Sequence, residues 1–251
     1  CHPSLANDNL SGVTLVSQLA EILSKKKRRL SYRFLFIPGT IGSITWLSRN
    51  EAILPRIVAG LVVACVGDNG TFHYKLSRRG DSLIDRTVQY VLASTNRAHV
   101  VRPFSPYGYD ERQYCSPGFN LPVGSLTRTP HGKFPEYHTS ADNLTFISAE
   151  ALGESLKTYL EVVTILENNL YYENLFPKGE PQLGRRGLYR AMGGLPDAGQ
   201  REMALLWVLN LADKSNSLFE LAVRSGLPFQ TVAETAAQLE EAGLVRAVPQ
   251  A

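Results

Sequence analysis

Two stretches of this chain predict its fold and its chemistry: CHPSLANDNLSG at residues 1–12 and YHTSAD at residues 137–142. Together they offer an imidazole (His2), a carboxylate (Asp8) and a second imidazole (His138). Zinc is bound by histidine nitrogen and carboxylate oxygen, and a catalytic site uses three protein ligands and leaves a fourth position for water. The two stretches therefore predict one zinc site with these three side chains as ligands.

The same stretches resemble the motifs of a known superfamily. Asp8–Gly12 and Tyr137–Asp142 are similar to the Asp-Asn-x-Ser-Gly and Tyr-His-Thr-x-x-Asp motifs of the zinc aminopeptidases in the di-zinc exopeptidase superfamily. A narrower resemblance is to a bacterial aminopeptidase-like family, associated with polysaccharide biosynthesis, whose members carry a C-terminal winged helix. It extends over nearly the whole chain, through the segments IPGTIGS (37–43), SRRGD (77–81) and YDERQY (109–114). The resemblance implies a zinc-exopeptidase-like fold and amide hydrolysis at a peptide N-terminus.

The composition predicts a soluble, globular protein. The chain has 251 residues with a net charge of +3, 44% hydrophobic and 20% charged residues, which is ordinary for a globular fold. This charge is too small to require nucleic acid or a membrane as a partner, and the apolar run Leu61–Val66 has only strand length. The sparse cysteines Cys1, Cys65 and Cys115 favour a reducing, cytoplasmic location. Because the chain opens on Cys1, without a visible signal peptide, we expect it to be the C-terminal part of a longer protein, with a first domain that is N-terminally incomplete.

The pattern of apolar residues predicts alternating strands and helices. Strands are expected at residues 32–37, 61–66, 71–76, 98–101 and 121–126, with 71–76 at an edge of the sheet, and helices at 13–23, 40–50, 81–94 and 146–169. This alternation predicts an α/β fold with a mainly parallel mixed sheet flanked by helices. We expect this domain at 1–175, a linker rich in Gly and Pro at 176–198, and a small winged helix-turn-helix domain at 199–251.

The departures from the peptidase pattern concern the remaining ligands. Active di-zinc aminopeptidases carry a Glu-Glu pair, one a general base and the other a ligand, and the corresponding segment here, FIPGTIGS at 36–43, has no carboxylate. A later aspartate ligand of the family falls near Cys65 and Asp68, and a buried structural cysteine is the simpler interpretation of Cys65. The His-x-Asp that usually orients the first imidazole is His2-Pro3-Ser4. These losses favour one zinc ion over two.

Two carboxylates remain as candidates for the catalytic general base. Glu111 lies beside Asp110 in the YDERQY segment, and Glu136 lies two residues before His138, which points both side chains to the same side of an extended segment. Glu111 could also hold a substrate amine, and either glutamate could instead pair with a nearby basic residue. Asp142 is expected to orient the His138 imidazole or to cap the turn that follows it. Asp110 is expected to support the site from outside the ligand set. No motif surrounds the other histidines, which we expect to be structural: His73, His99 and His131.

The end of the chain resembles the winged helix-turn-helix of bacterial regulators. Helices are expected at 200–212, 217–225 and 229–242, followed by a short strand at 246–248. The third helix offers glutamine, threonine and glutamate but no lysine or arginine, and carboxylates repel phosphate. Little chain remains after 246–248 to form a second strand of a wing. We therefore expect packing, dimerisation or protein docking from this domain ahead of duplex DNA binding.

The sequence thus predicts a metallo-aminopeptidase-like hydrolase that uses one zinc to activate water against an N-terminal peptide bond or a related amide. One alternative is a homologue that binds zinc but is catalytically inactive. Another is a ligand-sensing regulator whose winged helix binds DNA or protein. The expected partners are a peptide or an amino-group-bearing small molecule and, through the C-terminal domain, a second copy of the chain. No membrane partner is expected.

Overall fold

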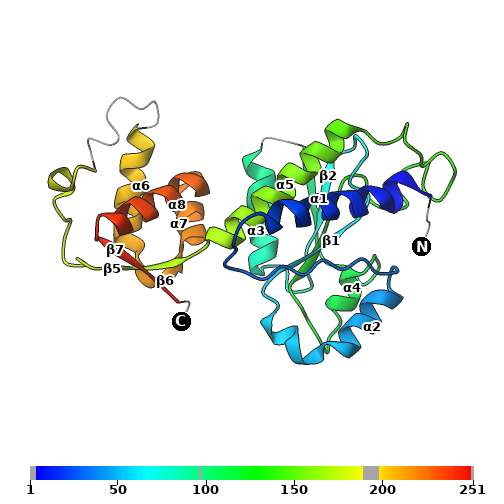
Figure 1. The fold of residues 1–251 in the computed structure, drawn as a ribbon, viewed down its shortest axis with the longest axis horizontal. Helices are drawn as coiled ribbons and strands as arrows, with labels where there is room; N and C mark the ends of the chain where they lie inside the picture. The colour runs from blue at the N-terminus through cyan, green and yellow to red at the C-terminus, as the bar shows by residue number, and fades with distance from the viewer. Residues whose placement is uncertain (1–3, 96–97, 189–197, 250–251) are drawn as a thin grey trace. The chain divides into compact units, whose positions relative to one another are not determined.

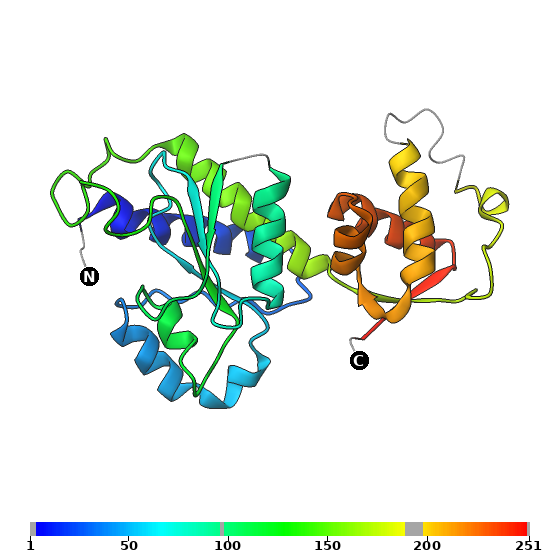
Figure 2. The same ribbon diagram turned by 180° about the vertical axis from the view of Figure 1, so that it is seen from behind.

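A computed structural model of the chain describes residues 4–95, 98–188 and 198–249. The chain divides into two compact units, Cys1–Val163 and Thr164–Ala251, which are drawn in Figures 1 and 2. None of the described helices has the length and apolar character that a bilayer crossing requires.

The first unit is built on a four-stranded sheet in the order β1-β4-β2-β3. Its strands are β1 (Gly60–Val63), β2 (Phe72–Lys75), β3 (His99–Arg102) and β4 (Val123–Thr127). β1 is parallel to β4 and β2 is parallel to β3, whereas β2 and β4 are antiparallel. The predicted mainly parallel mixed sheet is therefore confirmed. The expectation that residues 71–76 form an edge strand was wrong, because β3 pairs with the outer side of β2.

The described part of this fold contains five α-helices: α1 (Gly12–Ser24), α2 (Ile41–Arg49), α3 (Leu83–Ser94), α4 (Glu111–Tyr114) and α5 (Ala149–Asn168). A π-helix, η1 (Ala6–Ser11), precedes α1, and a 3-10 helix, η2 (Glu51–Arg56), follows α2. α1 buries Leu15, Leu19 and Leu23, whose spacing of four residues places them on one face. α3 begins with a capping box between Ser82 and Asp85. Figure 1 shows α1, α3 and α5 around the sheet, with α2 and α4 together at one end of the unit.

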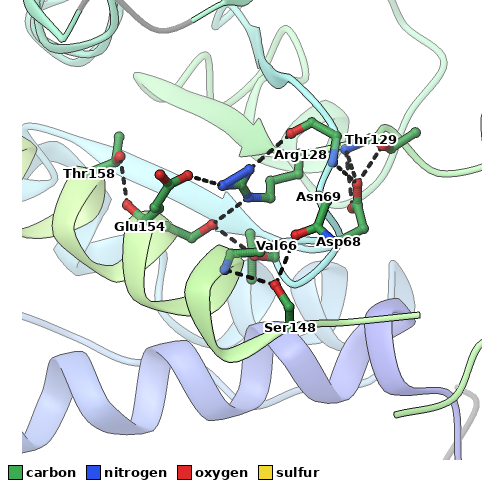
Figure 3. Close-up of polar contacts among 11 residues, drawn as sticks. Val66, Asp68, Asn69, Arg128, Thr129, Ser148, Glu154 and Thr158 are labelled. Atoms are coloured by element: carbon green, nitrogen blue, oxygen red, sulfur yellow. Dashed lines mark hydrogen bonds and ion pairs between the residues drawn. The ribbon is translucent and has the colours of Figure 1, made fainter. Parts of the chain in front are cut away.

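A buried arginine joins the end of β4 to α5 (Figure 3). Arg128 is 5% exposed, and its guanidinium donates to the Gly70 carbonyl at 2.9 Å and pairs with the Glu154 carboxylate at 2.5 Å. It also donates to the Ser155 hydroxyl at 3.3 Å, which in turn donates to the Val66 carbonyl at 2.8 Å. Buried charge is tolerated where partners of this kind compensate it. The network fixes the loops that follow β1 and β4.

Residues 32–37, predicted as a strand, belong to neither sheet. Their aromatic and β-branched composition suits a pleated, half-buried surface. A strand also requires a neighbour in register, and composition carries no information about that neighbour. Phe36 in this segment is 54% exposed.

The second unit is a winged helix-turn-helix, as predicted. Its helices are α6 (Ala198–Leu211), α7 (Leu218–Ser225) and α8 (Phe229–Glu241), and its sheet has the order β6-β5-β7, from β5 (Tyr171–Asn174), β6 (Asp213–Ser217) and β7 (Val245–Val248). The expectation that the wing strand lacks a partner was wrong. β7 pairs antiparallel with β5, which lies directly after α5 and not after β7. β5 also lies inside the range expected for the first domain, and the expected linker at 176–198 is described only as far as residue 188.

Candidate metal centre

The segment around Asp8 is held by the side chains on either side of it. Asn7, Asn9 and Ser11 all hydrogen-bond to residues 63–68, the segment that ends β1 and follows it, at 2.9–3.3 Å. Gly12 permits this close approach, because a Cβ at that position would lie 2.6 Å from the Val63 carbonyl oxygen. The side chains of Asn7, Asn9 and Ser11 thus anchor the segment to the end of β1. The Asp8 carboxylate does not take part in this anchoring.

The two sequence motifs, about 130 residues apart, meet at Asp142. Its Oδ1 accepts a hydrogen bond from the Asn7 N–H at 2.6 Å and its Oδ2 accepts one from the Asp8 N–H at 3.0 Å. Asp142 is 1% exposed. Its carboxylate therefore fixes the backbone that carries Asp8, and both of its oxygens are engaged there.

Asp8 and His138 form the centre of the site. His138 Nε2 lies 3.2 Å from Asp8 Oδ2, and the Tyr109 hydroxyl donates to Asp8 Oδ1 at 3.4 Å. Asp8 is 2% exposed, whereas the His138 side chain is 44% exposed. The His138 ring stacks on the Tyr137 ring, with a distance of 3.8 Å between the ring centroids. His138 has a φ of 58°, a left-handed conformation that costs energy in a non-glycine residue and that recurs at active sites. His2, the third expected ligand, lies outside the described residues.

The Asp8–His138 pair fits a zinc ion. Ligand atoms about 2.0–2.1 Å from a tetrahedral zinc lie about 3.3–3.4 Å from each other, close to the 3.2 Å observed. Both polar contacts of the Asp8 carboxylate are longer than the roughly 2.7–2.9 Å of a charge-assisted hydrogen bond. A buried carboxylate needs fuller compensation than this, and a cation would supply it. Within the described ranges, no cluster of three or more His, Cys, Asp or Glu side chains is arranged to hold a metal.

Neither Cys65 nor Asp68 is placed as a free ligand. Asp68 accepts hydrogen bonds from the Asn7 amide at 3.0 Å and the Thr129 hydroxyl at 2.6 Å, and Figure 3 shows its carboxylate turned toward Thr129. Burial, and then the nearby carboxylates of Asp8, Asp68 and Asp142, raise the pKa of the Cys65 thiol. This thiol therefore stays protonated at neutral pH, as a structural cysteine does.

Glu111 and Asp110 support the loop that carries Tyr109. Glu111 is 1% exposed, pairs with Lys75 at 2.7 Å and accepts the Tyr109 N–H at 3.1 Å. Asp110 accepts both the Thr40 N–H at 2.5 Å and the Ser43 hydroxyl at 3.1 Å on its Oδ1. Burial raises the pKa of Asp110. Glu111, a candidate base, is thus engaged by an internal lysine, and its link to Asp8 runs through Tyr109.

Glu136, the other candidate base, lines a hollow of about 500 Å³ together with Lys133, Phe134 and Phe146. Its carboxylate has no hydrogen bond or ion pair with any residue that the structure describes. It is therefore available to a ligand in this hollow.

The sequence interpretation missed the aromatic side chains around Asp8. Burial, followed by the charge of Asp8, raises the pKa of the Tyr109 hydroxyl and raises that of Tyr137 to about 12. The His131 ring lies 5.8 Å from the Tyr109 ring and 6.3 Å from the Tyr107 ring. No motif surrounds His131, so only the fold reveals its position.

Both units match families of known proteins. Residues 1–169 match a family model described as "Domain of unknown function (DUF4910)", and residues 170–247 match a winged helix-turn-helix model. The chain belongs to the DUF4910 family. A Clostridium acetobutylicum protein named "Putative polysaccharide biosynthesis protein with aminopeptidase-like domain" is 52% identical over 248 residues, which are 99% of this chain and 57% of the relative. The DUF4910 chain thus spans little more than half the length of this curated relative.

Solved structures of a putative peptidase and of aminopeptidases resemble the DUF4910 fold. A crystal structure of a "putative peptidase" from Clostridium acetobutylicum superposes with a TM-score of 0.91 at 50% identity, over 99% of this chain and 56% of that one. The aminopeptidase of Aneurinibacillus sp. strain AM-1 has a TM-score of 0.55 at 21% identity, over 64% of this chain and 39% of that one. A zinc aminopeptidase from Bacillus subtilis has a TM-score of 0.55 at 18% identity, over 64% and 42%. The DUF4910 domain therefore has the aminopeptidase fold, and the predicted combination with a winged helix is confirmed.

Proposed function

We propose that this chain carries the active site of a zinc-dependent aminopeptidase-like hydrolase acting on an N-terminal peptide bond or a related amide. The observation that supports it is the buried Asp8 carboxylate, 3.2 Å from the His138 imidazole and otherwise weakly compensated. The aminopeptidase names of the relatives point the same way.

One zinc ion, held by Asp8, His138 and His2, would polarise the substrate carbonyl and lower the pKa of a bound water. We propose one ion and not two, because the two places where carboxylate ligands of a second ion are expected offer no free carboxylate. The segment at 36–43 has no carboxylate, and the Asp68 carboxylate is engaged by Asn7 and Thr129.

The surrounding side chains have separate roles in this proposal. Tyr109 stays protonated, because burial raises its pKa, so its hydroxyl can donate to the negative charge that develops on a carbonyl oxygen beside Asp8. Glu111 and Asp110 position the loop of Tyr109. Glu136 is the carboxylate that we assign to a substrate's amine, since it lies two residues before His138 and its carboxylate has no partner among the described residues.

The test uses the full-length protein loaded with zinc. We expect about one zinc per chain by elemental analysis and turnover of aminoacyl p-nitroanilides. His138→Gln and Asp8→Asn should each lower zinc occupancy and turnover, while His99→Gln, on β3, serves as the matched control. Protein that binds no zinc would overturn the proposal. Zinc binding without turnover of any amide would favour the catalytically inactive homologue.

For the winged helix we propose packing or docking against protein, including a second copy of the chain. α8 contains no lysine or arginine, and its acidic side chains are partly engaged within the unit. Glu234 pairs with Arg201 at 3.4 Å, and Glu240 accepts the Ala247 N–H at 2.9 Å. Such a helix presents little positive charge to a phosphate backbone.

A further inference from the structure

The proposed reaction requires a group that accepts a proton from the attacking water. The Glu-Glu pair of the active di-zinc enzymes has no counterpart at residues 36–43. Glu111 is engaged by Lys75 at 2.7 Å and by the Tyr109 N–H at 3.1 Å. Glu136, the other candidate, is assigned above to the substrate's amine, so we look for the proton acceptor among other groups near Asp8.

His131 has the contacts expected of such a group. Its half-buried imidazole contacts the rings of Tyr107 and Tyr109, with ring centroids 6.3 and 5.8 Å apart. Among the described residues, none hydrogen-bonds to either ring nitrogen of His131. Both tyrosine rings are tilted against the imidazole, by 45° and 57°. These ring contacts use neither nitrogen, so each nitrogen can still bond to water or substrate.

Tyr109 connects His131 to the candidate metal ligands. Its ring packs against His131, and its hydroxyl lies 3.4 Å from Asp8 Oδ1. The charged groups that act on His131 are the carboxylates of Glu111 and Asp8 and the ammonium of Lys75. The imidazole therefore lies on the Tyr109 side of the site and within the electrostatic influence of Asp8.

Building on the proposed function, we propose that His131 is the general base and acid of the hydrolysis. It accepts one proton from the water whose oxygen bonds to the carbonyl carbon, and it returns that proton to the amine nitrogen as the C–N bond breaks. Nothing is oxidised or reduced, and the products are a carboxylic acid and an amine. A base of this kind acts directly or through one intervening water.

The protonation state of the imidazole agrees with this role. Burial lowers the pKa of His131, and the nearby Lys75 adds to this effect, while Glu111 and Asp8 oppose it. The imidazole is consequently neutral, and able to accept a proton, above a pKa that lies below the ordinary value of about 6.5. Turnover should rise as the pH increases through that pKa.

The experiment compares full-length, zinc-loaded wild type with His131→Gln and with the control His99→Gln, using an aminoacyl p-nitroanilide. We expect His131→Gln to lower kcat/KM by about 100-fold or more, with unchanged zinc content, and to abolish the acidic limb of the pH profile. His131→Ala should regain activity with added imidazole. Independently of turnover, imidazole ¹⁵N NMR should show a resonance, missing in His131→Gln, that titrates at the pKa of that limb.

The outcomes separate this inference from the proposed function. Wild type that turns over substrate while His131→Gln retains its rate and its acidic limb overturns the role of His131 and leaves the hydrolase intact. A His131 resonance that titrates above the ordinary histidine pKa also overturns that role. Wild type without zinc or turnover refutes both.

Discussion

Replacing Lys75 with methionine should destabilise the first unit by about 3–5 kcal/mol, because removing one partner of a buried ion pair leaves the other charge uncompensated. Lys75 Nζ lies 2.7 Å from Glu111 Oε1, and the two side chains are only 16% and 1% exposed, so solvent screens the pair little. The Tyr109 N–H, at 3.1–3.2 Å, would be left to compensate Glu111. For a unit of this size the expected loss corresponds to a fall in Tm of about 6–20 °C.

Urea unfolding followed by fluorescence measures this loss. A Trp207→Phe background leaves Trp46, in α2, to report on the first unit. The matched variant Lys75→Met/Glu111→Met removes both charges and should recover most of the stability, retaining a deficit of about 1–3 kcal/mol for the unpaired Tyr109 N–H. A cost below about 1 kcal/mol for Lys75→Met, as at an exposed pair, would refute the reasoning. So would a double variant no more stable than the single one.

Three further results are expected. In Asp142→Asn, one of the Asn7 and Asp8 N–H groups would face an amide N–H instead of a carboxylate oxygen. Zinc binding should weaken by about 10–100-fold in a chelator competition. Unchanged zinc affinity would contradict the role of Asp142 in anchoring the Asp8 backbone. Asp110→Asn keeps the Oδ1 that accepts both of its hydrogen bonds and removes a charge whose burial raises the pKa. It should equal or exceed wild type in Tm at pH 7, with a difference that shrinks toward pH 4, because the wild-type carboxyl becomes protonated there; a clearly less stable variant at pH 7 would refute this. Fluorescence anisotropy should find duplex DNA bound no more tightly than about 10⁻⁶ M at physiological salt, and tighter, salt-sensitive binding would contradict the docking role.

The fold was largely predictable where periodicity and burial agree. α1, α3 and α5 carry apolar stripes, and β4, which overlaps the strand expected at 121–126, is buried at all five positions. The errors share one cause: strand composition does not specify a partner. Residues 32–37 have strand composition without a strand neighbour, β2 is internal because β3 lies beside it, and the partner of β7 precedes it by some 70 residues in the chain.

The candidate site was predictable where residues fall in motifs. The proximity of Asp8, His138 and Asp142 was anticipated from two short stretches. The functions of Asn7, Asn9 and Ser11 were not, because their partners lie at the end of β1. His131 was set aside as structural for a similar reason: its neighbours are aromatic rings from another loop, and no spacing in the sequence records them.

The pairing of β5 with β7 restricts where the chain can be cut. A fragment that begins after residue 175 would lose the middle strand of the three-stranded sheet, and both β6 and β7 would then expose unpaired backbone groups. Exposed strand edges of this kind recruit other chains and promote aggregation. The second compact unit begins at Thr164, and Asn169 and Leu170 accept hydrogen bonds from the Phe219 and Leu218 N–H groups at the start of α7. Any attempt to express the winged helix alone should therefore start at or before Thr164.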